Sequence, residues 1–155
     1  LLLLTKIDNN QFIETENISI NNVLKYFIQQ YQPQAIEKQI IFSATYENEI
    51  ILNANKALIE ILIGNLLGNA IRHNFSDGQV NVFIIKNTLL IQNSGKSVAI
   101  DDRKIFQRFQ KDSVDNNSIG LGLEIVKKIC GLYHYEIDYH FVNNLHNFRV
   151  RFNNS

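Results

Sequence analysis

Asn65-Leu-Leu-Gly-Asn69-Ala-Ile-Arg-His73 is the stretch of this chain that decides its fold. It lies in an otherwise apolar segment, Ala57 to Ile71, whose length and composition predict a long helix. Residues four apart share one face of a helix, so Asn65, Asn69 and His73 should form a single stripe. Because burying an amide without a hydrogen-bond partner costs roughly 1–3 kcal/mol, this stripe predicts a helix wall that faces a bound ligand.

A second segment, Gly120-Leu121-Gly122-Leu123, places two glycines at the predicted entrance of another helix. Glycines at this position let backbone N–H groups approach phosphate oxygens, and a helix N-terminus favours negative charge. Together the two segments predict a site for a phosphorylated ligand.

Composition limits the classes of protein to which the chain can belong. Its 155 residues are 45% hydrophobic and 19% charged with a formal net charge of zero, which favours one globular domain and argues against broad binding of nucleic acid or anionic lipid. The single cysteine, Cys130, excludes an internal disulfide and is expected to be a small buried hydrophobe. We expect Leu1–Leu4 to be the end of an upstream helix and the chain to be a fragment. No segment approaches the ~20 apolar residues that span a bilayer.

Hydrophobic periodicity and turn residues predict alternating helices and strands along the rest of the chain. The predicted helices cover residues 20–31, 55 to about 74, and 121–132; the predicted strands cover 39–46, 50–52, 80–85, 89–92, 136–142 and 148–152. We expect Asn21 or Asn22 to cap the first helix, Asn55 to cap the second, and Pro33 to mark a break. This order predicts one mixed sheet covered on one face by helices.

Four segments in this order resemble the N, G1, F and G2 boxes of sensor histidine kinases. They are Asn65-x3-Asn69-Ala, Asn93-Ser-Gly95, Ile105-Phe-Gln-Arg-Phe109 and Gly120-Leu-Gly-Leu123. One such box is a weak signal, but four at the right separations are specific, and the resemblance extends from about Ile20 to Phe152. It implies the GHKL-type, or Bergerat, ATP-binding fold, a two-layer α/β sandwich that binds ATP and Mg²⁺.

The resemblance also implies a role for individual residues. Asn69 would give its carbonyl oxygen to Mg²⁺, a hard cation that prefers oxygen ligands, and Asn93 would accept a hydrogen bond from the adenine amino group. Arg72, His73 and Lys111 would contact phosphate, although a solvated helix end is an equal alternative for Arg72. The implied nucleotide-binding residues are Asn65, Asn69, Arg72, His73, Asn93, Gly95, Lys111, Gly120, Leu121, Gly122 and Leu123, with Asn65 and Arg72 also catalytic and Asn69 the metal ligand.

Within the family that the chain resembles, Asn65 distinguishes a kinase from a hydrolytic ATPase. In hydrolytic relatives the residue at this position is a glutamate that activates water. An amide cannot take a proton as a general base, so we expect this chain to hold ATP without hydrolysing it quickly.

The other boxes depart from the family pattern or have a simpler alternative. Asn93 replaces an aspartate, which removes charge assistance worth about 1 kcal/mol, while Ser97 and Ser118 each replace a glycine. Phe106 and Phe109 would anchor an ATP lid that continues to about Ser118, although taken alone they are more typical of core residues. Residues 112–118 carry almost no apolar side chain, which predicts mobility.

We therefore expect residues 16–155 to be the ATP-binding catalytic domain of a two-component sensor histidine kinase, and residues 1–15 the end of an upstream dimerisation helix and its linker. The γ-phosphate of ATP would go to a histidine on a dimerisation domain outside the chain. The expected partners are that domain, a response regulator and a second copy of the full-length kinase. The expected location is the cytoplasmic side of a membrane-bound bacterial sensor. A degenerate binding or scaffolding module is the first alternative, and a hydrolytic ATPase of the same fold is the second.

Overall fold

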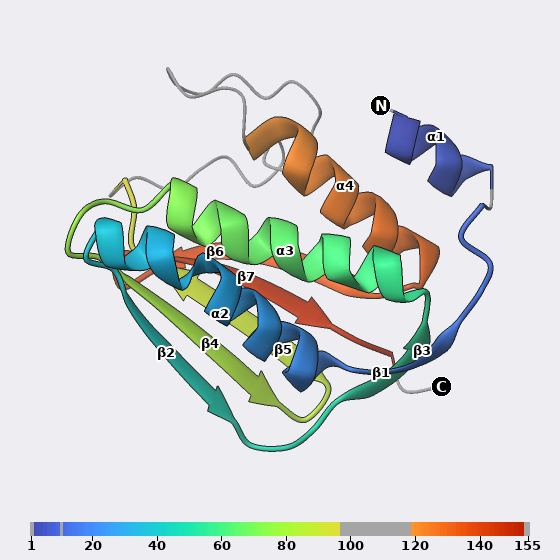
Figure 1. Cartoon of the computed structure of the whole chain (residues 1–155), viewed down its shortest axis with the longest axis horizontal. Coiled ribbons are helices and arrows are strands. Elements are labelled where there is room, and N and C mark those ends of the chain that lie inside the picture. Colours follow the sequence, from blue (N-terminus) through green and yellow to red (C-terminus); the bar gives the residue numbers. More distant parts are fainter. Residues whose placement is uncertain (1, 10, 97–118, 154–155) are drawn as a thin grey trace.

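The structure is a computed structural model that describes residues 2–9, 11–96 and 119–153, with the side chains of residues 119–121 excepted (Figure 1). Phe106, Phe109, Lys111 and the predicted lid over residues 112–118 lie outside the described residues.

A five-stranded mixed sheet forms one layer, in the order β2-β4-β5-β7-β6. Its strands are β2 (Ile41–Tyr46), β4 (Gln79–Ile85), β5 (Thr88–Asn93), β6 (Glu136–Val142) and β7 (Leu145–Arg151). The β2–β4 pair is parallel and the other pairs are antiparallel. Helices α2 (Ile20–Glu37), α3 (Lys56–Arg72) and α4 (Ile119–Leu132) lie across one face, with α3 in the middle (Figure 1). The predicted two-layer α/β fold is confirmed.

The core lies between the sheet and the helices. Alternate residues of β4 and β5 are buried, as expected for strands with one covered face. Helix α3 supplies most of the helical core because its apolar side chains surround the axis, and Asn55 caps it as predicted by accepting from Leu58 N at 3.1 Å. Cys130 is 1% exposed, which confirms its structural role, and burial raises its pKa to about 12.

Helix α2 begins at Ile20 as predicted, but it ends later than expected and has a different cap. It continues through Pro33 to Glu37, so the break expected at Pro33 was wrong, and Ala35 beyond the proline is fully buried. The cap is Ser19, whose hydroxyl accepts from Asn22 N, so the assignment to Asn21 or Asn22 was wrong. Asn21 instead accepts from Ile50 N at 3.0 Å and tethers the helix to the loop before β3.

A small second sheet lies apart from the main one. The strand predicted at residues 50–52 exists as β3 (Ile51–Ala54). It pairs antiparallel with β1 (Glu16–Ser19), a strand that was not predicted because its residues show no clear alternation of apolar and polar side chains. Asn55 follows β3 directly, so this ribbon leads the chain into α3.

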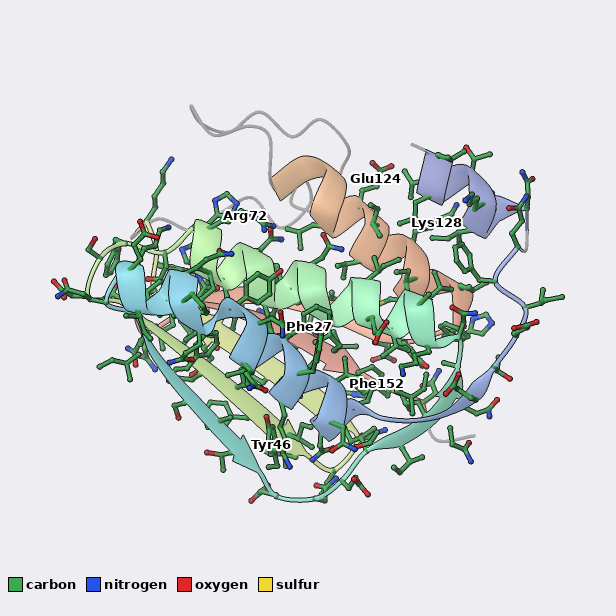
Figure 2. The ribbon with its side chains drawn as sticks, in the orientation of Figure 1. Phe27, Tyr46, Arg72, Glu124, Lys128 and Phe152 are labelled. Carbon is green, nitrogen blue, oxygen red and sulfur yellow. The ribbon has the colours of Figure 1, made fainter. Side chains whose placement is uncertain are left out.

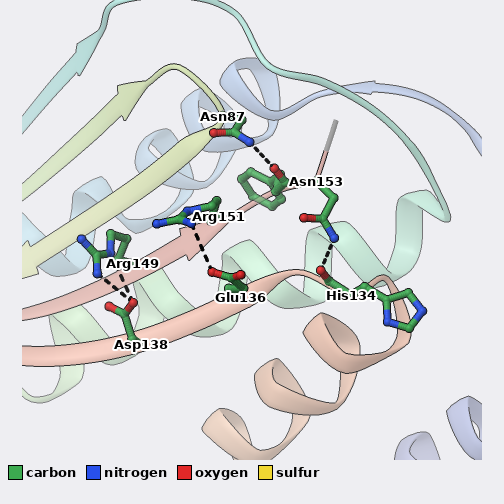
Figure 3. A network of polar contacts seen from close by, with 8 residues as sticks. Asn87, His134, Glu136, Asp138, Arg149, Arg151 and Asn153 are labelled. Carbon is green, nitrogen blue, oxygen red and sulfur yellow. Dashed lines mark hydrogen bonds and ion pairs between the residues drawn. The ribbon is translucent and has the colours of Figure 1, made fainter. Parts of the chain in front are cut away.

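Strands β6 and β7 form the predicted closing hairpin, but β7 begins three residues earlier than expected. Asn143 and Asn144 both have positive φ (54° and 61°), the conformation that a two-residue hairpin turn requires. On the face away from the helices, Arg149 pairs with Asp138 at 2.9 Å and Arg151 pairs with Glu136 at 3.4 Å (Figure 3). These pairs join opposite residues in the strand register.

The N-terminal helix α1 (Leu2–Asp8) packs on α4. Leu4 and Ile7 are buried, whereas Leu2 is 70% exposed, and Asp8 forms an ion pair with Lys128 of α4. The boundary expected between residues 15 and 16 remains a prediction. Among the described residues, no helix combines the length and the apolar character needed to cross a bilayer.

Candidate functional site

Two asparagines of α3 carry the polar chemistry of the predicted helix wall. Asn65 donates from Nδ2 to the Ile61 carbonyl at 2.7 Å, a bond to the preceding turn of its own helix. Asn69 is only 5% exposed, its Oδ1 accepts from Arg72 Nη2 at 2.9 Å, and its buried Nδ2 has no hydrogen-bond partner. An amide nitrogen without a partner is costly, so Asn69 is the described residue of α3 with the clearest need for a ligand.

Arg72 is the last residue of α3 (Figure 2), and its Nη2 donates to Asn69 Oδ1 three residues before it. It can do so because Gly68 has no side chain: a Cβ there would lie 2.8 Å from both Arg72 Nη1 and the Tyr31 hydroxyl oxygen. Tyr31 is in turn held by donating to the Gly64 carbonyl at 3.0 Å. Arg72 therefore brings a positive charge to Asn69 while its side chain stays solvent-accessible.

His73 is the C-cap of α3 and not part of the helical stripe that the sequence predicted. Its backbone N–H donates to the Asn69 carbonyl at 3.0 Å, and its side chain is half-buried.

The first turn of α4 lies against the two asparagines. A Cβ at Gly122 would be 3.0 Å from Asn65 Oδ1 and 3.9 Å from Asn69 Oδ1. The helix begins at Ile119, two residues before its predicted start, so Gly120 and Gly122 both lie inside its first turn. The first four N–H groups of a helix have no intrahelical acceptor, and the turn of α4 that carries them lies beside the asparagines of α3 at Gly122.

Leu123 contributes differently from the glycines that precede it. Its side chain is 1% exposed and belongs to the core. Its place in the nucleotide-binding set remains a prediction.

A second group of polar residues follows β5. Asn93 is 4% exposed and donates from Nδ2 to the Ser94 carbonyl at 2.8 Å. The Ser94 hydroxyl donates to Asn74 Oδ1 at 2.7 Å and accepts from Gln79 N at 2.7 Å, which ties the turn to the end of α3 and the start of β4. A Cβ at Gly95 would lie 2.9 Å from the His73 carbonyl oxygen.

The structure thus places the polar and glycine residues of the site in two neighbouring groups near the C-terminal end of α3. Asn65, Asn69, Arg72 and Gly122 form the first, called the amide group. Asn93, Ser94 and Gly95 form the second, called the β5 turn. His73 and Asn74 connect them, through contacts with Gly95 and Ser94 respectively. Lys111 lies outside the described residues.

The donor set limits how a metal could be held. In the described part of the chain, no three histidines, cysteines, aspartates or glutamates gather into a metal-binding cluster. Mg²⁺ in nucleotide sites usually takes one or two protein oxygens, with phosphates and waters as its other ligands. The single oxygen of Asn69 fits that pattern.

Sequence reasoning missed Ser94, Asn74 and His146 as parts of this region. His146 is 6% exposed and pairs with Asn93 across β5 and β7. Burial lowers the pKa of His146, although its hydrogen bond to the Lys96 carbonyl opposes this shift. The alternation of His146, Phe148 and Val150 predicts an inward-facing side chain, but the pairing with Asn93 follows only from strand order.

A known protein family matches most of this chain. Residues 54–152 match the family described as histidine kinase-, DNA gyrase B-, and HSP90-like ATPase. The heme sensor protein HssS of Staphylococcus saprophyticus is 36% identical over 140 residues, which are 86% of this chain and 30% of that protein. HssS of Staphylococcus aureus strain Newman is 34% identical over 145 residues, 90% of this chain and 32% of that protein. The chain therefore spans about a third of the length of these relatives.

Solved structures share the fold at low sequence identity. The nucleotide-free catalytic domain of histidine kinase ThkA superposes with a TM-score of 0.78 at 20% identity, over 90% of this chain and 95% of that one. ThkA in complex with the response regulator protein TrrA superposes with a TM-score of 0.73 at 18% identity, over 97% of this chain and 46% of that one. Full-length ShkA in complex with AMPPNP superposes with a TM-score of 0.71 at 21% identity, over 88% of this chain and 30% of that one.

Proposed function

The chain belongs to the family of histidine kinase-, DNA gyrase B- and HSP90-like ATPases, and from this we propose that it binds ATP with Mg²⁺ and transfers the γ-phosphate to a histidine of another domain. It is an ATP-binding catalytic domain of the sensor histidine kinase type. The transfer, the residues that carry it and its partners are the content of the proposal.

The approach of α4 to α3 is the observation that best supports the proposal. Gly122 brings the first turn of α4 against Asn65 and Asn69, while Arg72 adds a guanidinium on the same side. Phosphoryl transfer needs positioning and charge neutralisation more than covalent chemistry. N–H groups of a helix N-terminus and an arginine supply both, because each is a donor to phosphate oxygens.

Asn69 is the proposed protein ligand of Mg²⁺. Its Oδ1 is a neutral oxygen donor, and Arg72 Nη2 is its present hydrogen-bond partner. When bound, Mg²⁺ neutralises charge on the phosphates. Arg72 would then be free to donate to phosphate oxygens, and Asn69 Nδ2 would find the acceptor that it now lacks.

The β5 turn is the proposed binding site of the base. Asn93 lies at the end of β5, where its side-chain carbonyl can accept a hydrogen bond from the adenine amino group. Gly95 lets the turn pass close to the end of α3. The two groups of site residues would therefore hold the two ends of one nucleotide.

Asn65 supports a kinase over a hydrolase. It is an amide whose nitrogen is engaged by the Ile61 carbonyl, and it cannot accept a proton from water. We infer that ATP is held intact until an acceptor histidine reaches it.

The proposed acceptor is a histidine on a dimerisation domain that is not part of this chain. The full-length kinase would be a homodimer that passes phosphate to a response regulator, with this domain on the cytoplasmic side of a bacterial membrane. The structural neighbour ThkA in complex with response regulator protein TrrA supports a partner of this class.

Calorimetric titration of the chain with ATP and ADP, with and without Mg²⁺, tests the proposal. We expect both nucleotides to bind, Mg²⁺ to strengthen ATP binding, and γ-labelled ATP to leave no stable label on the chain itself. Addition of a kinase dimerisation domain should produce labelled phosphohistidine. Absence of nucleotide binding would favour the degenerate-module alternative, and rapid release of inorganic phosphate would favour the hydrolase.

A further inference from the structure

His146 lies directly beneath the β5 turn. It is the second residue of β7, it is opposite Asn93 in the strand register, and it is 6% exposed. Buried polar side chains in proteins are almost always hydrogen-bonded. The partners of His146 therefore indicate what it does.

Both ring nitrogens of His146 have a partner. Nε2 is 2.8 Å from the Lys96 carbonyl oxygen, and Nδ1 is 2.7 Å from the Tyr139 hydroxyl. A carbonyl oxygen can only accept, so the proton must be on Nε2. Burial lowers the pKa of the His146 ring below its ordinary value, so the ring is neutral near pH 7 and Nδ1 accepts from the Tyr139 hydroxyl.

Packing fixes the ring in this position. It stacks on Tyr139 with centroids 5.8 Å apart and contacts Phe141 with centroids 4.8 Å apart. A Cβ at Gly95 would lie 3.1 Å from His146 Cδ2, and 2.9 Å from the His73 carbonyl oxygen. The β5 turn is therefore held between the end of α3 and the imidazole.

We propose that His146 is a positioning residue for the nucleotide base: through the Lys96 carbonyl it holds the β5 turn in the shape that presents Asn93 to adenine. This inference rests on the proposed function, because it takes Asn93 as the base contact. The bond from His146 Nε2 ties Lys96, which follows the β5 turn, to strand β7.

Two substitutions of His146 separate its hydrogen bond from its bulk. His146→Gln keeps an N–H donor near the position of Nε2, whereas His146→Phe keeps a ring of similar size without the donor. Loss of one net hydrogen bond of about 1 kcal/mol corresponds to a roughly fivefold weaker affinity. We expect His146→Phe to weaken ATP and ADP equally by about this factor and His146→Gln to bind nearly as the wild type does.

The outcomes are distinct. Equal affinities for wild type and a folded His146→Phe would overturn the proposal, as would a loss confined to ATP or an equal loss in His146→Gln. Nitrogen-15 NMR of the wild-type histidines should show His146 as the Nε2–H tautomer, and the other tautomer would also overturn it. If the wild type bound no nucleotide, the proposed function would fail.

Amide hydrogen exchange tests the positioning role without nucleotide. Faster exchange at residues 94–96 in His146→Phe than in His146→Gln would still support that role, and equal exchange would refute it.

Discussion

Gly122→Ala tests whether the close approach of α4 to α3 matters for nucleotide binding. A Cβ at this position would lie 3.0 Å from Asn65 Oδ1, and Asn65 cannot simply move away because its Nδ2 donates to the Ile61 carbonyl at 2.7 Å. Either Asn65 shifts by a few tenths of an ångström or the first turn of α4 moves outward. Both changes disturb the end of the site that we assign to the phosphates.

The expected effects on stability and on binding differ. Alanine in a helix interior is favoured over glycine by about 1 kcal/mol, and the crowded contact costs about 1–3 kcal/mol. Stability should therefore change little or fall by up to about 2 kcal/mol. A hydrogen bond from the protein to a charged phosphate oxygen is worth about 1.5–3 kcal/mol. Loss of one such bond should therefore weaken ATP binding about tenfold or more.

Gly131→Ala is the matched control because it lies in the same helix and a Cβ there would have no neighbour within 4 Å. It should gain up to about 1 kcal/mol in stability and leave ATP affinity unchanged. Thermal unfolding and calorimetric titration of both variants measure the two effects. If Gly122→Ala bound ATP as tightly as Gly131→Ala does, the contact between Gly122 and the asparagines would have no role in binding, and our reasoning would fail.

Three further changes probe the rest of the site. Asn69→Ala should abolish the Mg²⁺-dependent part of ATP binding while the domain stays folded; circular dichroism checks the fold, and an unchanged response to metal would exclude Asn69 as the ligand. Asn93→Ala should weaken the binding of ATP and ADP alike. Asn93→Asp should tighten the binding of both by about 1 kcal/mol, roughly fivefold, as measured by calorimetric titration. A loss of affinity confined to ATP in Asn93→Ala would place Asn93 near the γ-phosphate. Burial lowers the pKa of His146 below its ordinary 6.5, so the unfolded state binds the proton more readily. The contribution of His146 to the free energy of unfolding is therefore complete above about pH 6.5 and falls as the pH drops toward the lowered pKa. Urea unfolding at several pH values should show this loss of stability in the wild type and not in His146→Gln. Equal slopes of unfolding free energy against pH in the two proteins would contradict the prediction. In the described part of the chain, the ring is hydrogen-bonded to the Tyr139 hydroxyl and the Lys96 carbonyl.

Local features of the sequence were sufficient for much of the fold. The apolar run around Asn65 and Asn69 predicted α3, and Asn55 capped it as expected. These predictions succeeded because helix periodicity and capping depend on residues within a few positions of one another. The break expected at Pro33 was wrong, because α2 continues through it to Glu37. Whether a helix tolerates such a residue depends on tertiary context as well as on local propensity.

The sequence by itself determined which residue types could bind a nucleotide, since paired asparagines and glycines at a helix start carry their chemistry locally. Tertiary structure alone decided how these residues meet. Gly122 lies 57 positions from Asn65 in the chain and reaches it only because α3 and α4 pack side by side. His146 likewise supports the β5 turn only because β7 pairs with β5. The physical reason is that helix packing and strand register depend on burial summed over the whole domain, and no short segment contains that information.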